Sequence, residues 1–185
     1  MLEVILAFVY AVAIFFTDSL IWQFFLTVIF LILVLPGIYS MFFGAPFVIS
    51  LKSRVKAILK LGDFDSKQRV VELGCGDARV IREVAKRGVK EAVGYEFSVP
   101  TFLLARLLTF LRGSGETICF KNFWYADLSR FDIVICFLMK ETMFDFEKRI
   151  WPNLKTGAKV ISNSFKMKHV VPAKCEDNVY LYVKK

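Results

Sequence analysis

The amino-acid sequence predicts an α/β fold with a mostly parallel, doubly wound sheet, an antiparallel closing strand, and an N-terminal transmembrane helix or helical hairpin. Strand-like and helical segments alternate regularly from Ser53 onward, which is typical of such a sheet. The run VVELGCGDARV, residues 70–80, joins an apolar strand to a helix through a Gly-x-Gly turn. The chain before Lys52 is strongly apolar and contains no Lys or Arg. Together these observations predict a membrane segment followed by a basic soluble domain.

The N-terminal segment has the composition of a membrane anchor. Its only charged side chains are Glu3 and Asp18, whereas all 25 Lys and Arg residues of the chain lie at or after Lys52. The apolar run Ser19–Ile38 is long enough to span a hydrocarbon core of about 30 Å. The earlier run, Val4–Phe16, is short for a second span. We therefore expect either a helical hairpin or a single transmembrane helix preceded by an embedded one.

Basic residues follow this segment directly and predict its orientation: Lys52, Arg54, Lys56 and Lys60. Positively charged flanks stay on the cytoplasmic side and attract anionic headgroups. We expect residues 1–43 to be a membrane anchor and residues 44–185 to be a domain on the cytoplasmic face of a membrane.

The elements of the domain follow in order along the chain. Helices are expected where apolar residues recur at helical spacing: Ser53–Leu61, Ala78–Arg87, Pro100–Leu111 and Glu141–Ile150. Parallel strands are expected at short apolar runs bounded by turn residues: Arg69–Leu73, Glu91–Glu96, Thr117–Lys121, Asp132–Leu138 and Lys159–Asn163. The alternating run Val179–Lys184 predicts the antiparallel closing strand, with which Val170–Cys175 can pair.

The Gly-x-Gly turn between the first strand and its helix indicates a cofactor site. Gly74 and Gly76 allow a sharp turn and a close approach of the backbone to a ligand. Glu96 ends the second strand about 20 residues later, where an acid can accept hydrogen bonds from both hydroxyls of a ribose. Such an arrangement is typical of a Rossmann-like domain that binds an adenosine-containing cofactor.

The residues around the turn favour S-adenosylmethionine over a dinucleotide. Arg79 stands where a dinucleotide site has its third glycine, and Asp77 would repel a pyrophosphate at the start of the helix. Glu72, two residues before the first glycine, is typical of sites for S-adenosylmethionine, which carries an ammonium and a sulfonium. The stretch ELGCGDA resembles motif I of class I methyltransferases, with Ala78 at the place of a frequent third glycine.

The carboxyl ends of the strands predict the rest of the pocket. We expect Cys75 to face the amino-acid end of the cofactor and Phe97 to face its ribose and adenine. Asn122 is a candidate partner of the adenine amino group, and Phe123 or Trp124 is a candidate to stack on the ring, although core packing explains the two aromatic residues equally well. The chain has a single histidine, and its cysteine spacing matches no zinc pattern, so no metal is expected.

The acceptor end of the pocket is informative through the patterns that it lacks. The fourth strand is not followed by Asn-Pro-Pro-Tyr, the pattern that holds a planar amide or base amine for methylation. The aromatic and glycine patterns of an RNA-binding module are also missing, so the basic charge is read as attraction to headgroups and no nucleic acid is expected.

Longer stretches resemble one family. These stretches are Ala45-Pro46-Phe47-Val48, VVELGCGDARV, NFWYADLSRFDIVICFL, Lys155-Thr156-Gly157, SNSF and the late strand VYLY. They are similar to the small membrane-anchored protein lysine methyltransferases, whose known members modify the c subunit of ATP synthase and the adenine nucleotide translocase. The chain departs from this family at Ala78, at Asn122, where the family usually has Asp, and near Lys140, where it often has Pro.

The resemblance implies N-methylation of a protein lysine, with a membrane protein as substrate. Glu141 and Asp127 are the candidates to orient the amine or take its proton, although each is also explained as a surface or capping acid. Two other classes stay open: a phospholipid or small-molecule N-methyltransferase, and a non-catalytic cofactor-binding membrane module.

Overall fold

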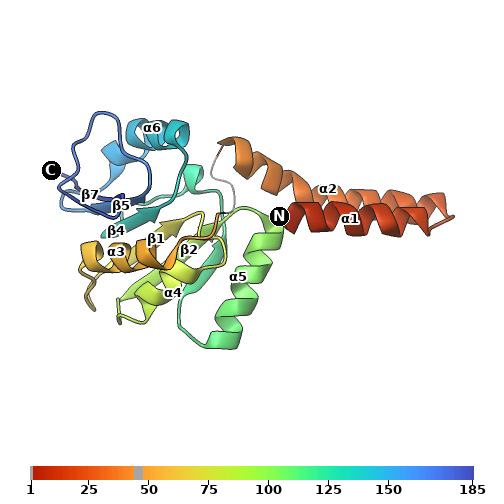
Figure 1. The fold of residues 1–185 in the computed structure, drawn as a ribbon, viewed down its shortest axis with the longest axis horizontal. Helices are drawn as coiled ribbons and strands as arrows, with labels where there is room; N and C mark the ends of the chain where they lie inside the picture. Colours follow the sequence, from red (N-terminus) through yellow and green to blue (C-terminus); the bar gives the residue numbers. More distant parts are fainter. Residues whose placement is uncertain (1, 44–47) are drawn as a thin grey trace.

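The computed structural model contains the predicted mostly parallel sheet (Figure 1) and describes residues 2–43 and 48–185. The seven strands lie in the order β3-β2-β1-β4-β5-β7-β6. Their bounds are β1 Arg69–Leu73, β2 Glu91–Glu96, β3 Thr117–Phe120, β4 Ile133–Cys136, β5 Lys159–Asn163, β6 Lys174–Glu176 and β7 Val179–Val183. Strands β1 to β5 pair in parallel, and β7 pairs antiparallel with β5 and β6. The doubly wound sheet with an antiparallel closing strand is therefore confirmed.

Helices cover both faces of the sheet. The helices of the domain are α3 Lys52–Gly62, α4 Arg79–Ala85, α5 Val99–Arg112 and α6 Lys140–Arg149, with 3₁₀ turns at Phe123–Tyr125 and Trp151–Asn153. Residues of α6 pack into one apolar core with the inner side chains of the sheet, and residues of α3, α4 and α5 pack into a second core on the other face. The parallel strands are thus buried on both sides, which explains their continuous apolar runs.

Helix α4 begins one residue later than the sequence predicts. Ala78 has a φ of 62°, in the left-handed region, so it belongs to the turn and not to the helix. Strand β4, Ile133–Cys136, is shorter at both ends than the predicted Asp132–Leu138. Just before it, the Asp132 carboxylate accepts a hydrogen bond from the Arg69 backbone N–H at 2.7 Å. The predicted strands Arg69–Leu73, Glu91–Glu96 and Lys159–Asn163 are observed with the same bounds.

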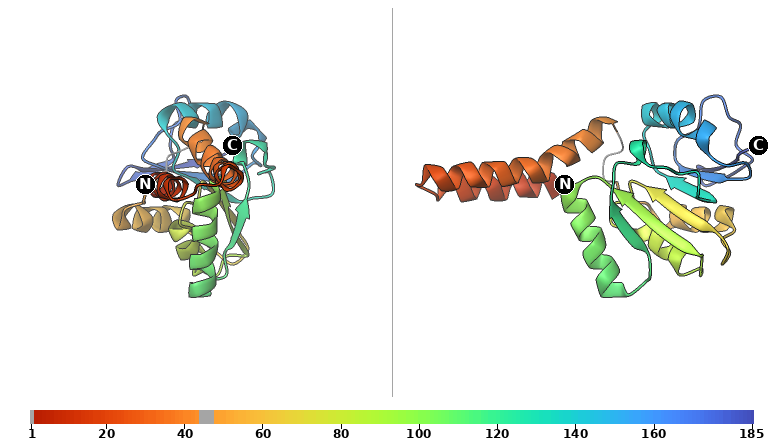
Figure 2. Two further views of the ribbon diagram at one scale, coloured as in Figure 1. Left: turned by 90° about the vertical axis from the view of Figure 1, so that its right-hand side faces the viewer. Right: turned by 180° about the vertical axis from the view of Figure 1, so that it is seen from behind.

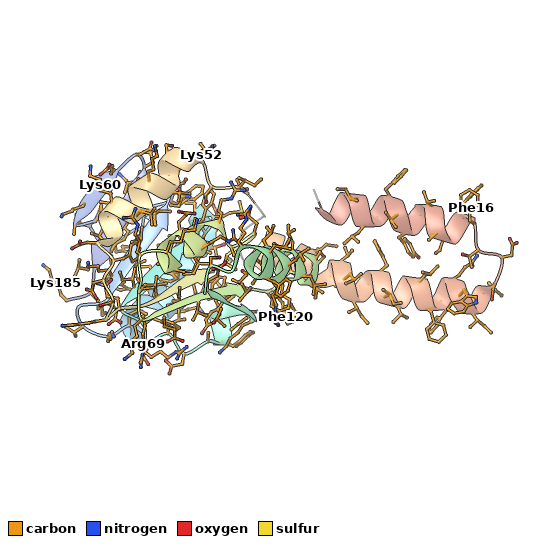
Figure 3. The ribbon with its side chains drawn as sticks, turned by 90° about the horizontal axis from the view of Figure 1, so that it is seen from below. Phe16, Lys52, Lys60, Arg69, Phe120 and Lys185 are labelled. Carbon is orange, nitrogen blue, oxygen red and sulfur yellow. The ribbon has the colours of Figure 1, made fainter. Side chains whose placement is uncertain are left out.

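The N-terminal helices form a hairpin that extends away from the domain (Figures 1 and 3). Helix α1, Leu2–Phe15, lies beside α2, Leu20–Phe43. The hydroxyls of Tyr10 and Thr27 lie 2.7 Å apart, and the rings of Tyr10 and Phe30 stack with centroids 4.3 Å apart. Helix α2 continues through Pro36-Gly37 to Phe43, and Figure 2 shows that it is bent.

The predicted transmembrane helix is not found. Among the residues that the structure describes, no helix is both long enough and apolar enough to cross a membrane. Helix α1 has 14 residues, which at about 1.5 Å a residue gives a length well below the ~30 Å of a hydrocarbon core.

Candidate functional site

The candidate site lies at the carboxyl ends of β1 and β2, which pair in register with Leu73 opposite Tyr95. The turn after β1 is held against β2 by the Cys75 N–H, which donates to the Tyr95 carbonyl at 3.0 Å. Gly74 and Gly76 have φ values of 67° and 58°, which only glycine adopts without strain. A methyl group added to Gly74 would meet no other atom within 4 Å, so the space above this part of the turn is open.

Glu96 joins the two strand ends. One carboxylate oxygen accepts a hydrogen bond from the Gly76 N–H at 3.0 Å, and the other accepts from the N–H groups of Phe97 and Ser98, both at 2.8 Å. The predicted site residues of the first two strands are therefore brought together by one buried carboxylate. The sequence spacing predicted this proximity but not the hydrogen bonds that produce it.

Glu72 adds a second buried carboxyl to the same edge. It accepts a hydrogen bond from the Ile81 N–H at 2.9 Å, in the first turn of α4. The pKa of Glu72 is raised to about 8, mainly by burial; the hydrogen bond from Ile81 opposes this rise, and the negative charges of Asp77 and Glu96 contribute to it. Three carboxyl groups thus converge beside the turn, and this is an arrangement that favours a cationic ligand.

Asp77 and Arg79 form an ion pair in the turn, with 2.7 Å between Oδ2 and Nη2. Although burial opposes it, the hydrogen bonds from Arg79 hold the pKa of Asp77 below its usual value. Arg79 also donates to the Ser50 carbonyl at 3.3 Å, so the segment before α3 contacts the cofactor turn. The sequence predicts the repulsion of a pyrophosphate by Asp77 but not this pairing.

The residues around the carboxyl end of β3 divide between the candidate site and the core. The ring of Phe97 stacks on that of Phe120, with centroids 5.4 Å apart. Asn122 accepts a hydrogen bond from the Trp124 N–H at 3.1 Å and so caps the 3₁₀ turn, while Phe123 is buried in the core with its ring 4.8 Å from that of Trp124. The packing alternative that the sequence left open for Phe123 is therefore the better supported one.

The two candidate acids for proton transfer have different surroundings. Asp127 is exposed, and one of its oxygens accepts bonds from the Ser129 N–H at 2.9 Å and the Ser129 hydroxyl at 2.7 Å. These bonds hold the pKa of Asp127 below its usual value, which makes it a weak base. Glu141 is exposed in the first turn of α6, which follows the carboxyl end of β4.

The structure adds a polar residue, Asn163, which the sequence indicates only as part of the stretch SNSF. Asn163 is buried at the carboxyl end of β5, and its amide nitrogen lies 3.4 Å from the Ser50 hydroxyl. Ser164 has a φ of 75° and donates to the Asn163 side-chain oxygen at 3.1 Å. A polar pair at the end of a buried strand is the signal that could have identified this position. In the part of the chain that the structure describes, no group of three or more His, Cys, Asp or Glu residues could hold a metal ion.

Comparison with known families decides between the cofactor classes. Residues 72–174 match the ANTKMT methyltransferase domain. The chain belongs to this family. It is an S-adenosylmethionine-dependent methyltransferase, and its cofactor is S-adenosylmethionine.

Three relatives illustrate the likeness. This methyltransferase is 30% identical over 151 residues to a protein-lysine N-methyltransferase of Saccharolobus islandicus, an alignment that covers 75% of this chain and 92% of the relative. It is 30% identical over 99 residues to the adenine nucleotide translocase lysine N-methyltransferase of Mus musculus, covering 52% of this chain and 43% of the relative. It is 30% identical over 130 residues to the lysine N-methyltransferase of the ATP synthase c subunit from Xenopus laevis, covering 69% and 56%. The chain thus spans about half the length of these two animal relatives.

A solved structure has the same fold. An RNA methyltransferase from Salinibacter ruber in complex with S-adenosyl-L-homocysteine superposes with a TM-score of 0.69 and 24% identity, covering 74% of this chain and 93% of that one. At this identity the likeness concerns the fold alone.

The residues of the site fit the cofactor. The open space above Gly74 leaves room for a ligand at the turn, and the carboxyl groups of Glu72 and Glu96 lie beside it, where a cationic ligand would favour their ionised form.

Proposed function

We propose that this enzyme methylates a lysine side chain of a protein at a membrane surface. The observation that carries the proposal is the convergence of Glu72, Asp77 and Glu96 on an open glycine turn, in a chain of the ANTKMT methyltransferase family. The relatives named above are lysine methyltransferases, which supports lysine as the acceptor.

The cofactor is proposed to lie across the ends of β1 and β2. Glu96 accepts hydrogen bonds from the ribose hydroxyls, and the backbone of Gly74, Cys75 and Gly76 faces the amino-acid end beside Glu72, while the Cys75 thiol is buried against Gly94. Phe97 covers the adenine side together with Phe120, on which it stacks. Asn122 is proposed to lie near the adenine amino group. Phe123 supports this wall from the core.

The methyl transfer itself is an in-line displacement. S-adenosylmethionine held at this turn would supply an electrophilic methyl group on its sulfonium, for transfer to the lone pair of a lysine Nζ with the thioether as leaving group. The amine must arrive without its proton, since a protonated amine has no lone pair. A desolvated position at the sheet edge lowers the pKa of a lysine, and positioning supplies most of the catalysis. Glu141 is our candidate to orient the amine, with Asp127 as the weaker base.

We divide the chain into a membrane-contact module, residues 1–43, and a methyltransferase domain, residues 44–185. The hairpin of the first module is proposed to hold the enzyme at a membrane. Apart from Tyr10, Gln23 and Thr27, the described side chains of its two helices are apolar. Phe15 and Leu20 near its tip are each 81% exposed. A helix that is apolar all round requires an apolar environment. Lys52 and its basic neighbours lie next to the hairpin in sequence, where they favour anionic headgroups.

The test is methylation of isolated membranes with labelled S-adenosylmethionine. We expect label in a protein band and methyl-lysine in its mass spectrum. Residues 44–185 alone should bind the cofactor but methylate the membrane substrate much more slowly, because the hairpin supplies effective concentration. Label found only in lipid would favour a phospholipid N-methyltransferase instead, and failure of the intact chain to bind S-adenosylmethionine would favour a non-catalytic module.

A further inference from the structure

Helix α5 has an apolar face that the described residues, 2–43 and 48–185, do not cover. Pro100, Thr101 and Ala105 are buried against the domain. On the opposite side lies an exposed stripe with the spacing of a single helical face: Leu103, Leu107, Phe110 and Leu111. Phe110 is 82% exposed and Leu111 is 68% exposed. A surface helix in water carries charged residues on this side, so the stripe marks a contact surface.

The stripe lies on the same side of the domain as the hairpin. Figure 2 shows α5 at the end of the domain from which α1 and α2 extend, running crosswise to them. Figure 3 shows α5 end-on between the domain and the hairpin. Helices α1 and α2 both contact α5. The hairpin and the exposed face of α5 therefore form adjoining apolar surfaces.

The charges of α5 indicate which kind of partner covers the stripe. The helix carries no acidic side chain, and its only charged residues are Arg106 and Arg112, both exposed. The Arg106 guanidinium lies 5.8 Å from the centre of the Phe102 ring, at the border of the apolar face. Apolar side chains flanked by arginines are the pattern of a helix that lies in the plane of an anionic membrane surface.

We propose that the exposed face of α5 is a second membrane-contact surface, which lies flat on an anionic bilayer beside the hairpin. The inference rests on the proposed function, in which the hairpin contacts the membrane. With α5 flat on the surface, the methyltransferase domain has a fixed orientation. Because α5 begins directly after the Glu96–Ser98 segment, the carboxyl edge of the sheet then faces the bilayer. The acceptor lysine is accordingly one that lies at headgroup level.

The test measures the depth of α5 in a bilayer with the full chain. A bimane label is placed at Phe110→Cys, and at Val171→Cys as the matched control, in a chain that also carries Cys175→Ser to remove the exposed native thiol. Val171 is 85% exposed in the segment that leads into β6, at the edge of the sheet remote from α5. Each labelled chain is mixed with vesicles of phosphatidylcholine and phosphatidylglycerol that contain brominated acyl chains.

We expect the label at position 110 to be quenched at least about threefold more strongly than the label at 171, because an interfacial helix places its apolar face about 5–10 Å into the headgroup and acyl boundary. Adding Leu107→Asp to the chain labelled at 110 should reduce its quenching to the level of the control. Binding of S-adenosyl-L-homocysteine, measured by calorimetry, verifies that each variant is folded.

The ways in which the inference can fail are distinguishable. If the chain sediments with vesicles but the labels at 110 and 171 are quenched equally, α5 does not contact lipid, while the role of the hairpin stands. If the chain does not sediment with vesicles, the membrane part of the proposed function and this inference both fail. Cross-linking between position 110 of two chains, with no quenching, would show that a second copy covers α5 and would overturn the inference.

Discussion

Binding of S-adenosylmethionine should release a proton from Glu72. In the free protein, burial raises the pKa of this carboxyl to about 8, so at pH 7 about nine-tenths of the molecules carry it protonated. Positive charge placed beside the turn favours the carboxylate and lowers the pKa. If the pKa falls to about 7 or below, between about 0.4 and 0.9 protons leave for each ligand bound at pH 7.

The number of released protons is measured by titration calorimetry at pH 7 in buffers with different ionisation enthalpies, such as phosphate and Tris. The slope of the observed enthalpy against the ionisation enthalpy gives the protons released. The Glu72→Gln variant has the same shape but no titrating group, so its slope should be close to zero. A binding enthalpy that is independent of the buffer in the unmodified protein would refute the reasoning.

The same carboxyl determines how the stability of the ligand-free protein depends on pH. Its pKa in the folded state, about 8, lies above the ordinary value of 4.5. The folded state therefore binds more protons than the unfolded state between these two values, and the free energy of unfolding falls as pH rises through that window. The loss is at most about 5 kcal/mol and is complete above the folded-state pKa. Thermal unfolding from pH 5 to 9 should show the decline in the unmodified protein and a much flatter profile in Glu72→Gln.

Three further predictions concern single side chains. The Glu96 carboxylate accepts hydrogen bonds from three backbone N–H groups, and Glu96→Gln replaces one of its accepting oxygens by a donating amide. Calorimetry should therefore show that S-adenosylmethionine binds more weakly by about 1–3 kcal/mol. The control variant Glu91→Gln, at the other end of the same strand, should bind the cofactor normally. Asp127→Asn should leave kcat within about threefold, whereas Glu141→Gln should lower it by about tenfold or more if Glu141 assists proton removal; equal effects would contradict this ranking. Gly94→Ala would place a methyl group 2.6 Å from the Cys75 thiol in the glycine turn. Chemical unfolding should therefore show a loss of about 1–3 kcal/mol in the free energy of unfolding. An unchanged midpoint would count against tight packing of β2 on the turn.

The sequence predicts the sheet well because buried parallel strands have a local signature. Strands β1, β2 and β5 are continuous apolar runs with clear turn residues at both ends, and their predicted bounds agree with the structure. The start of α4 is less predictable, because the left-handed conformation of Ala78 depends on the turn around it and not on its own preference. The predicted transmembrane helix is not among the helices of the residues that the structure describes.

The candidate site could be predicted only in part. The spacing of Glu72, the glycine turn and Glu96 follows from one strand–turn–helix–strand unit, so their proximity is visible in the sequence. The contact between Ser50 and Asn163 joins residues that are 113 positions apart, and no local pattern predicts it. The stripe on α5 has helical spacing in the sequence, but only the structure shows that the opposite side of the helix faces the core.

In the proposed binding mode, cofactor binding and the position of α5 depend on the same carboxylate. Ribose hydroxyls that donate to Glu96 must share its oxygens with the N–H groups of Phe97 and Ser98, which hold the chain just before α5 begins at Val99. A carboxylate has about four acceptor sites, so sharing is feasible, but each added bond draws electron density from the others. Contact of α5 with a bilayer restrains this same segment from the other side. An enzyme whose α5 is held on a membrane would therefore present a more ordered Glu96 to the cofactor than the same chain free in detergent. The difference is measurable as tighter binding of S-adenosylmethionine in vesicles than in detergent, and Leu107→Asp should remove it.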